Sequence, residues 1–99
     1  MSQREELITL NNARVASIEL AIGEESQWHY HTELVENVVC LNGSIELQCS
    51  SPELLVRLNP GERKEIKPMR KHRLVNLGDT EATYLLVQSG NYDFVSTNS

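Results

Sequence analysis

The residue types that could do chemistry in this chain gather in one spaced pattern. All three histidines belong to it: His29 and His31 are two residues apart, and His72 follows later, with Glu36 between the pair and the third. Neutral imidazoles and a carboxylate together suit divalent first-row metals such as iron, manganese, nickel and zinc. Four protein ligands leave positions free in an octahedral shell, where substrate, water or dioxygen can bind. The pattern therefore predicts one divalent transition metal held by these four side chains.

The spacing of the first two histidines fits a β-strand. Side chains two apart on a strand point to the same face, so His29 and His31 can bind one ion while Trp28 and Tyr30 point away. A single histidine on an apolar strand is more often a hydrogen-bonded core residue than a ligand. Three histidines with a glutamate at matched spacing favour the metal site, and the alternative is a degenerate site that binds none.

These residues resemble the first motif of the cupin superfamily, G-x5-H-x-H-x4-E-x6-G, which is complete here over residues 23–43. A second motif follows with Gly61, His72 and Asn76. The resemblance covers about residues 15–94 and points to small single-domain cupins of the quercetinase-like and RmlC-like type. It implies an all-β fold, the cupin β-barrel or double-stranded β-helix, which is a jelly-roll sandwich. It also implies that the four residues above are the metal ligands.

Apolar and polar residues alternate over many short segments, independently of the resemblance. Turn residues separate these segments, which favours a sandwich or barrel of roughly ten strands and no helix. We expect one domain over residues 1–99, with its core at about 15–94 and a flexible tail at 95–99. The predicted strands cover residues 15–22, 27–32, 36–41, 44–49, 54–58, 63–67, 72–77 and 82–88.

The dipeptide Asn42-Gly43 is favoured in type I′ turns, in which both residues have positive φ. It predicts a hairpin that pairs residues 36–41 with 44–49 and places Glu36 opposite Cys49. On this register Cys49 lies beside the metal as a candidate substrate-binding thiol, although a buried cysteine is usually a small hydrophobe. Cys40 and Cys49 are then roughly 13 Å apart along the strands, too far for a disulfide. We therefore expect two free thiols.

Other side chains are candidates for binding substrate or moving protons. Six of the nine lysines and arginines lie within residues 63–73, where they can form a charged edge that prevents sheet pairing. Among them Arg70, two residues before the third histidine, is the candidate to bind a substrate carboxylate. Tyr84 and Gln88 share one strand face and become catalytic candidates if that face points inward, which alternation alone leaves open. Glu36 could also leave the metal and act as a base.

Composition narrows the partners. A net charge of −5 and a pI near 5.1 disfavour nucleic acid, because phosphate binding needs a cationic face. No apolar run approaches the ~18 residues of a membrane span. A polar start and two cysteines without a CxxC spacing argue against secretion, so we expect a cytoplasmic protein. Two neighbouring outward aromatic residues, Trp28 and Tyr30, favour a homodimer.

The predicted function is a metal-dependent enzyme that acts on a small oxygen-rich or carboxylate-bearing molecule. The resemblance favours dioxygenase-type chemistry, and the same ligand set occurs in cupin isomerases, lyases and decarboxylases. A non-catalytic module that binds a metal or a small metabolite, as a sensor or pathway accessory, is the alternative from another class. No GxSxG elbow or phosphate-binding glycine loop competes with the metal hypothesis.

Overall fold

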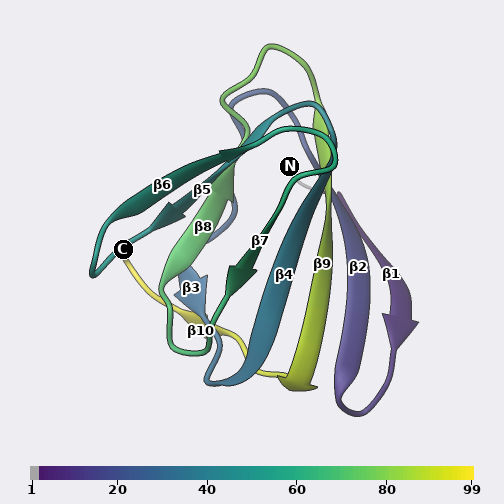
Figure 1. Ribbon diagram of the computed structural model, residues 1–99, viewed down its shortest axis with the longest axis vertical. Helices are drawn as coiled ribbons and strands as arrows, with labels where there is room; N and C mark the ends of the chain where they lie inside the picture. Colours follow the sequence, from purple (N-terminus) through teal and green to yellow (C-terminus); the bar gives the residue numbers. More distant parts are fainter. Residues whose placement is uncertain (1–2) are drawn as a thin grey trace.

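The computed structural model describes residues 3–99, so Met1 and Ser2 of the expected domain lie outside the described part. The described residues form ten strands and no helix. The strands make two five-stranded antiparallel sheets that face each other across the core (Figure 1). The predicted all-β jelly-roll sandwich is therefore confirmed.

Each sheet combines strands that are distant in the sequence. The first has the order β1-β2-β9-β4-β7, with bounds Gln3–Thr9, Ala13–Leu20, Ala82–Asn91, Glu33–Asn42 and Arg63–Ile66. The second has the order β10-β3-β8-β5-β6, with bounds Val95–Ser96, His29–Tyr30, His72–Val75, Ile45–Cys49 and Leu54–Leu58. All eight predicted strands are present, seven of them with shifted ends and β6 with the ends predicted, and β1 and β10 are additional. Strand β1 is exposed along its whole length, so it has no burial alternation that a pattern could reveal.

The alternation of buried and exposed side chains along β9 shows which of its faces points inward. Tyr84 and Gln88 are buried together with Ala82 and Leu86, whereas Val87 is exposed. Strand β4, which pairs with β9 along most of its length, buries Leu34, Glu36, Val38 and Cys40 in the same way. The question that alternation left open is thus answered: Tyr84 and Gln88 face the interior.

The predicted Asn42-Gly43 hairpin is wrong. Strand β4 pairs with β7 and β9 in the first sheet, and β5 pairs with β6 and β8 in the second, so the chain crosses between sheets at this turn. Gly43 has φ +75°, and a Cβ there would lie 2.7 Å from the carbonyl oxygen of Glu81. Gly43 thus has the positive φ expected of it. It lies in the connection that leads from β4 in the first sheet to β5 in the second.

The end of the chain is also more ordered than expected. Residues 95–99 were predicted to be a flexible tail, but Val95 pairs with Tyr30 and Ser96 with His29, and the Thr97 amide donates to the Trp28 carbonyl at 3.0 Å. The segment therefore forms a sheet edge through long-range contacts that local sequence does not reveal.

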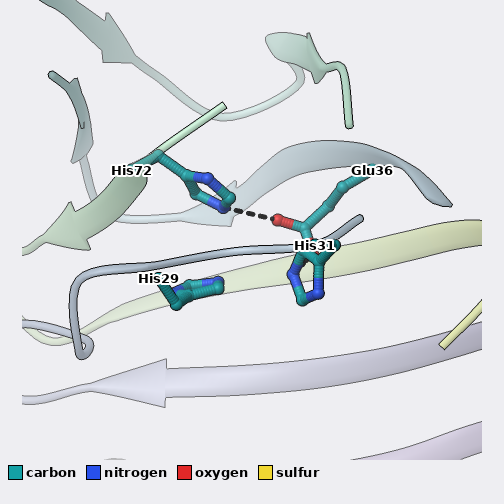
Figure 2. Close-up of side chains that lie close together, drawn as sticks. All are labelled: His29, His31, Glu36 and His72. Atoms are coloured by element: carbon teal, nitrogen blue, oxygen red, sulfur yellow. Dashed lines mark hydrogen bonds and ion pairs between the residues drawn. The ribbon is translucent and has the colours of Figure 1, made fainter. Parts of the chain in front are cut away.

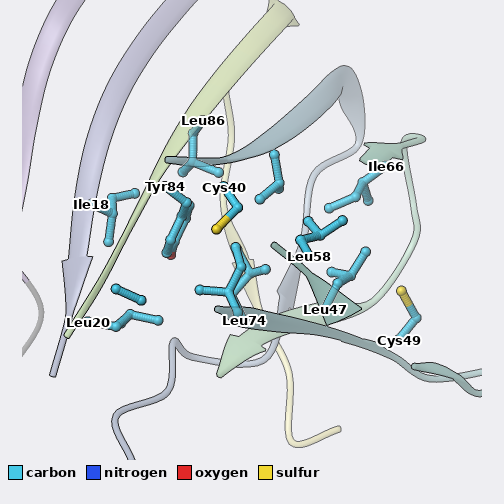
Figure 3. Close-up of a cluster of buried hydrophobic side chains, with 13 residues drawn as sticks. Ile18, Leu20, Cys40, Leu47, Cys49, Leu58, Ile66, Leu74, Tyr84 and Leu86 are labelled. Carbon is cyan, nitrogen blue, oxygen red and sulfur yellow. The ribbon is translucent and has the colours of Figure 1, made fainter. Parts of the chain in front are cut away.

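The core fills the space between the two sheets (Figure 3). Both cysteines are buried and free, as predicted, with Cys40 on β4 and Cys49 on β5. Because the hairpin is absent, the strand partner of Cys49 is His72 rather than Glu36. The cluster consists of Ile18, Leu20, Val38, Cys40, Ile45, Leu47, Cys49, Leu58, Ile66, Leu74, Ala82, Tyr84 and Leu86.

Candidate metal centre

The four predicted ligands meet at one end of this core (Figure 2). His29 lies on β3 and His72 on β8, where they are directly paired across the second sheet. His31 follows β3, and Glu36 reaches in from β4 of the first sheet. Ligand atoms from all four lie within 4.8 Å of one another, and all four residues are buried. The structure thus brings together the complete set predicted from spacing.

Each histidine ring is oriented by a backbone carbonyl. His29 Nδ1 lies 2.7 Å from the Gln27 oxygen, His72 Nδ1 lies 2.7 Å from the Arg70 oxygen, and His31 Nδ1 contacts the Asp93 oxygen. A carbonyl can only accept, so each Nδ1 carries a hydrogen and donates it. In a neutral ring this leaves the lone pair on Nε2, which is the tautomer that a metal ligand needs.

Glu36 lies at the centre of the cluster. His72 Nε2 lies 3.0 Å from its Oε1, and His31 Nε2 lies 3.4 Å from its Oε2. The amide of Gln88 donates to Oε2 at 2.6 Å. Burial acts against the ionised form, but the hydrogen bonds from His31, His72 and Gln88 outweigh it and hold the pKa of Glu36 well below its ordinary value. The carboxylate is therefore ionised at neutral pH.

The surroundings of the rings shift their pKa values in opposite directions. Burial, with a smaller contribution from His72, lowers the pKa of His29 to about 4, so this ring is neutral at pH 7. Burial also acts to lower the pKa of His31, but its contacts with Glu36 and the Asp93 carbonyl outweigh burial and raise it. The buried carboxylate of Glu36 thus favours positive charge at this point of the cluster, which a bound cation would supply.

These residues fit a divalent metal. The Nε2 atom of His31 is buried and has no hydrogen-bond partner of good geometry among the described residues. Imidazole nitrogens and a carboxylate oxygen converge on one point, with each Nδ1 already satisfied by a carbonyl. This is the donor set that iron, manganese, nickel or zinc accepts.

The cluster opens into a cavity of about 120 Å³. Tyr84 and Gln88 line it together with His29, His31 and Glu36. Burial raises the pKa of Tyr84, so its hydroxyl keeps its proton and can donate a hydrogen bond. The two β9 candidates therefore share a cavity with the ligands. Much of the remaining wall is apolar, from Ile18, Leu74, Leu86 and Phe94.

Arg70 and Cys49, the two predicted substrate-binding residues, line a different cavity. This second cavity, of about 240 Å³, lies between β5, β6 and β7 and is also lined by Lys64 and Lys67. The Arg70 guanidinium donates to the Ser50 carbonyl at 2.9 Å. Burial raises the pKa of the Cys49 thiol, so it is a protonated core side chain. The structure does not bring either residue to the metal cavity.

Several residues at the metal cavity were missed from the sequence. Phe94 stacks on His29 with ring centroids 4.4 Å apart and an angle of 14° between the planes. The Asp93 carboxylate accepts hydrogen bonds from the amide and hydroxyl of Thr32, at 2.9 and 2.7 Å, while its carbonyl orients His31. The alternation of Tyr92 and Phe94, two residues apart, was the available signal. Arg4, on the unpredicted β1, also lines the cavity.

The remaining residue of the second motif has a structural role. The Asn76 side chain donates to the carbonyls of Leu20 and Thr80, at 3.1 and 2.9 Å, and accepts from the Gly78 amide at 3.0 Å. It therefore fixes the turn after β8. On the outer side of the ligand strand, Trp28 is half-buried beneath Arg73, whose guanidinium lies 4.9 Å from the indole ring.

Comparison with known families agrees with this geometry. A model of the cupin domain family matches residues 16–88. The chain is a cupin. No curated protein matches its sequence. In the described part of this cupin no helix is long and apolar enough to cross a membrane.

Solved structures share the cupin fold at low sequence identity. An uncharacterized conserved protein with a double-stranded β-helix domain from Klebsiella pneumoniae is 20% identical, with a TM-score of 0.89 over 99% of this chain and 85% of that one. Oxalate oxidase is 19% identical, with a TM-score of 0.85 over 97% of this chain and 55% of that one. A sugar phosphate isomerase of the cupin superfamily from Silicibacter pomeroyi is 25% identical, with a TM-score of 0.76 over 97% and 66%. This cupin thus spans about half the length of oxalate oxidase.

Proposed function

We propose that this cupin is a metal-dependent enzyme acting on a small oxygen-rich or carboxylate-bearing molecule, with dioxygenase-type chemistry as the leading reaction. One observation carries the proposal: three carbonyl-oriented histidines and one ionised glutamate converge where a small cavity begins. A structural polar cluster would need neither the cavity nor three inward Nε2 atoms.

Each residue at the cavity has a role in this proposal. His29, His31, Glu36 and His72 would hold a divalent ion, which would supply Lewis acidity, and redox chemistry if it were iron or manganese. Gln88 holds the Glu36 carboxylate in place through its 2.6 Å hydrogen bond. Tyr84 donates a hydrogen bond to an oxygen of the substrate, and the apolar wall limits the access of water.

The cavity volume supports a small substrate. An apolar cavity of about 150 Å³ takes up one benzene molecule, and the metal cavity has about 120 Å³. A reacting group of a few heavy atoms therefore fits. Oxalate oxidase, which shares the fold, is named for a small carboxylate-bearing substrate, and that name supports the proposed substrate class.

A second candidate is an isomerase, lyase or decarboxylase that uses the same site. The likeness to the sugar phosphate isomerase, at 25% identity over 97% of this chain, favours an isomerase within that group. A binding module without turnover is the third reading, and it differs from both enzymes in having no product.

A reconstitution experiment tests the proposal. Untagged protein is stripped of metal and reloaded separately with Fe(II), Mn(II), Ni(II) and Zn(II), then mixed with a panel of small hydroxy acids and dicarboxylates. We expect oxygen uptake with iron or manganese, measured with an oxygen electrode, and none in the Glu36→Gln variant. Product formation without oxygen uptake, detected by NMR, would favour the isomerase group. No product with any metal would contradict catalysis and leave the binding module.

A further inference from the structure

One arginine lines the metal cavity, and it is Arg4. It is not Arg70, which the sequence suggested because Arg70 lies close to His72. Arg4 is the single lysine or arginine among the described residues of the cavity wall. It comes from β1, where it pairs with Ile18 of β2, and Ile18 in turn pairs with Tyr84 of β9. Arg4, Ile18 and Tyr84 thus form one row across the inner face of the first sheet.

The present partner of Arg4 is a weak competitor. Its Nε donates to Glu6 Oε1 at 2.6 Å, and the two side chains are 38% and 40% exposed. Ion pairs with this exposure are weak, because water and salt screen them. The guanidinium has five N–H donors, so it can bind an incoming anion while it releases or shares Glu6.

The row also provides a second donor. The Tyr84 hydroxyl has no hydrogen-bond partner among the described residues, although the residue is 2% exposed and lines the cavity. Burial keeps its proton in place. A carboxylate at this end would meet a guanidinium and a neutral hydroxyl, which together form strong, directional hydrogen bonds.

We propose that Arg4, assisted by Tyr84, binds a carboxylate of the substrate at the end of the cavity remote from the metal ligands. The inference rests on the proposed function and narrows its substrate class. The substrate is a short molecule with a carboxylate at one end and a metal-binding oxygen group at the other.

The register gives the length of that molecule. Tyr84 and Gln88, which is bonded to Glu36, are four residues apart on β9, or roughly 13 Å along the strand. The arginine side chain covers part of this distance. A chain of several carbons therefore spans the remainder, and a two-carbon diacid is too short to reach both ends.

The experiment measures binding rather than turnover. Protein loaded with redox-inert Zn(II) is titrated by calorimetry with oxalate, succinate, glutarate and adipate, and with the methyl monoesters of the longer acids. We expect the longer diacids to bind more tightly than oxalate. The Arg4→Gln variant should bind them about tenfold more weakly, because it loses one charge-assisted hydrogen-bonded pair. Its affinity for the monoesters should fall much less.

Matched variants separate this role from nonspecific charge. Arg57→Gln on β6 removes an exposed arginine outside both cavities. It should bind the diacids like the wild type. Arg4→Lys should recover part of the affinity, and Glu6→Gln should tighten binding about twofold by removing the competing carboxylate. Circular dichroism and zinc content confirm that each variant is folded and loaded.

Three results would overturn the inference: unchanged diacid binding in Arg4→Gln, an equal loss in Arg57→Gln, or no binding of any diacid by the wild type. Arg4-dependent binding with no turnover under any metal would support the inference while contradicting the enzymatic proposal, so the two can fail separately.

Discussion

Two cavities adjoin the hydrogen-bonded Glu36–His72 pair, and they differ in what their polar groups face. The strand partners of this pair, Ile66 and Cys49, line the second cavity, while Glu36 itself lines the metal cavity. The metal cavity gathers histidine Nε2 atoms around an ionised carboxylate. The second gathers cationic side chains around a protonated thiol and apolar residues. Proximity to a ligand in the sequence or along a strand therefore does not place a residue in the site.

Metal removal should have the largest effect, because the ion stabilises the fold through the metal cavity and not through the second cavity. A ligand present at about a thousand times its Kd stabilises a fold by about 4 kcal/mol. For a chain of this length that corresponds to a Tm lower by roughly 15 °C or more after chelation. Differential scanning fluorimetry of the loaded protein with and without a chelator checks this. An identical Tm in both would mean that the cluster binds no metal of consequence.

Replacing the carboxylate of Glu36 should abolish this stabilisation by metal. Glu36→Gln keeps the shape of the side chain but removes the charge that faces His31 and His72. We expect metal affinity to fall by at least about 100-fold, since even residues behind the ligands contribute 10- to 100-fold. Competition with a chromophoric chelator measures it. Wild-type affinity in this variant would show that the histidines alone hold the ion.

The segment that covers the ligands should have an intermediate effect. Phe94→Ala removes the ring stacked on His29, so the imidazole gains freedom and metal affinity should fall about tenfold. The same chelator competition measures this change, with Leu55→Ala, an exposed residue of β6, as the control. Equal affinities in the two variants would show that β3 and its pairing with β8 suffice to orient His29.

The second cavity should give the smallest effect. Cys49→Ala removes a buried sulfur next to His72 along the sheet but no group that faces the metal site. We expect a loss of about 1 kcal/mol in unfolding free energy, from urea denaturation, and an unchanged metal affinity. A large loss of metal affinity in Cys49→Ala would show that Cys49 contributes to the metal site and that the two cavities are not separate in function.

The ligands could be predicted because their geometry is local or is fixed by a motif. His29 and His31 share a face through the period of a strand, and the predicted strands bring His72 to the same sheet. The hairpin predicted at Asn42-Gly43 was wrong because the same dipeptide can either close a hairpin or connect strands of two different sheets. Which occurs depends on where β4 finds its partners, and those lie in β7 and β9.

The walls of the site could not be predicted for a related reason. Arg4 and Phe94 come from the two ends of the chain and reach the cavity through pairings with distant strands. Arg70, close to His72 in sequence, bonds to Ser50 instead. The packing of the whole domain decides which distant strands pair, and the residue pattern of a single strand does not identify its partner.

Elemental analysis tests for the metal centre itself. Untagged wild-type protein and the His29→Ala variant are purified side by side, since a histidine tag would itself carry metal. We expect about one divalent metal per wild-type chain and little or none in the variant. Absence of metal from the wild type even after reconstitution, or an equal content in the variant, would contradict a metal centre at His29, His31, Glu36 and His72.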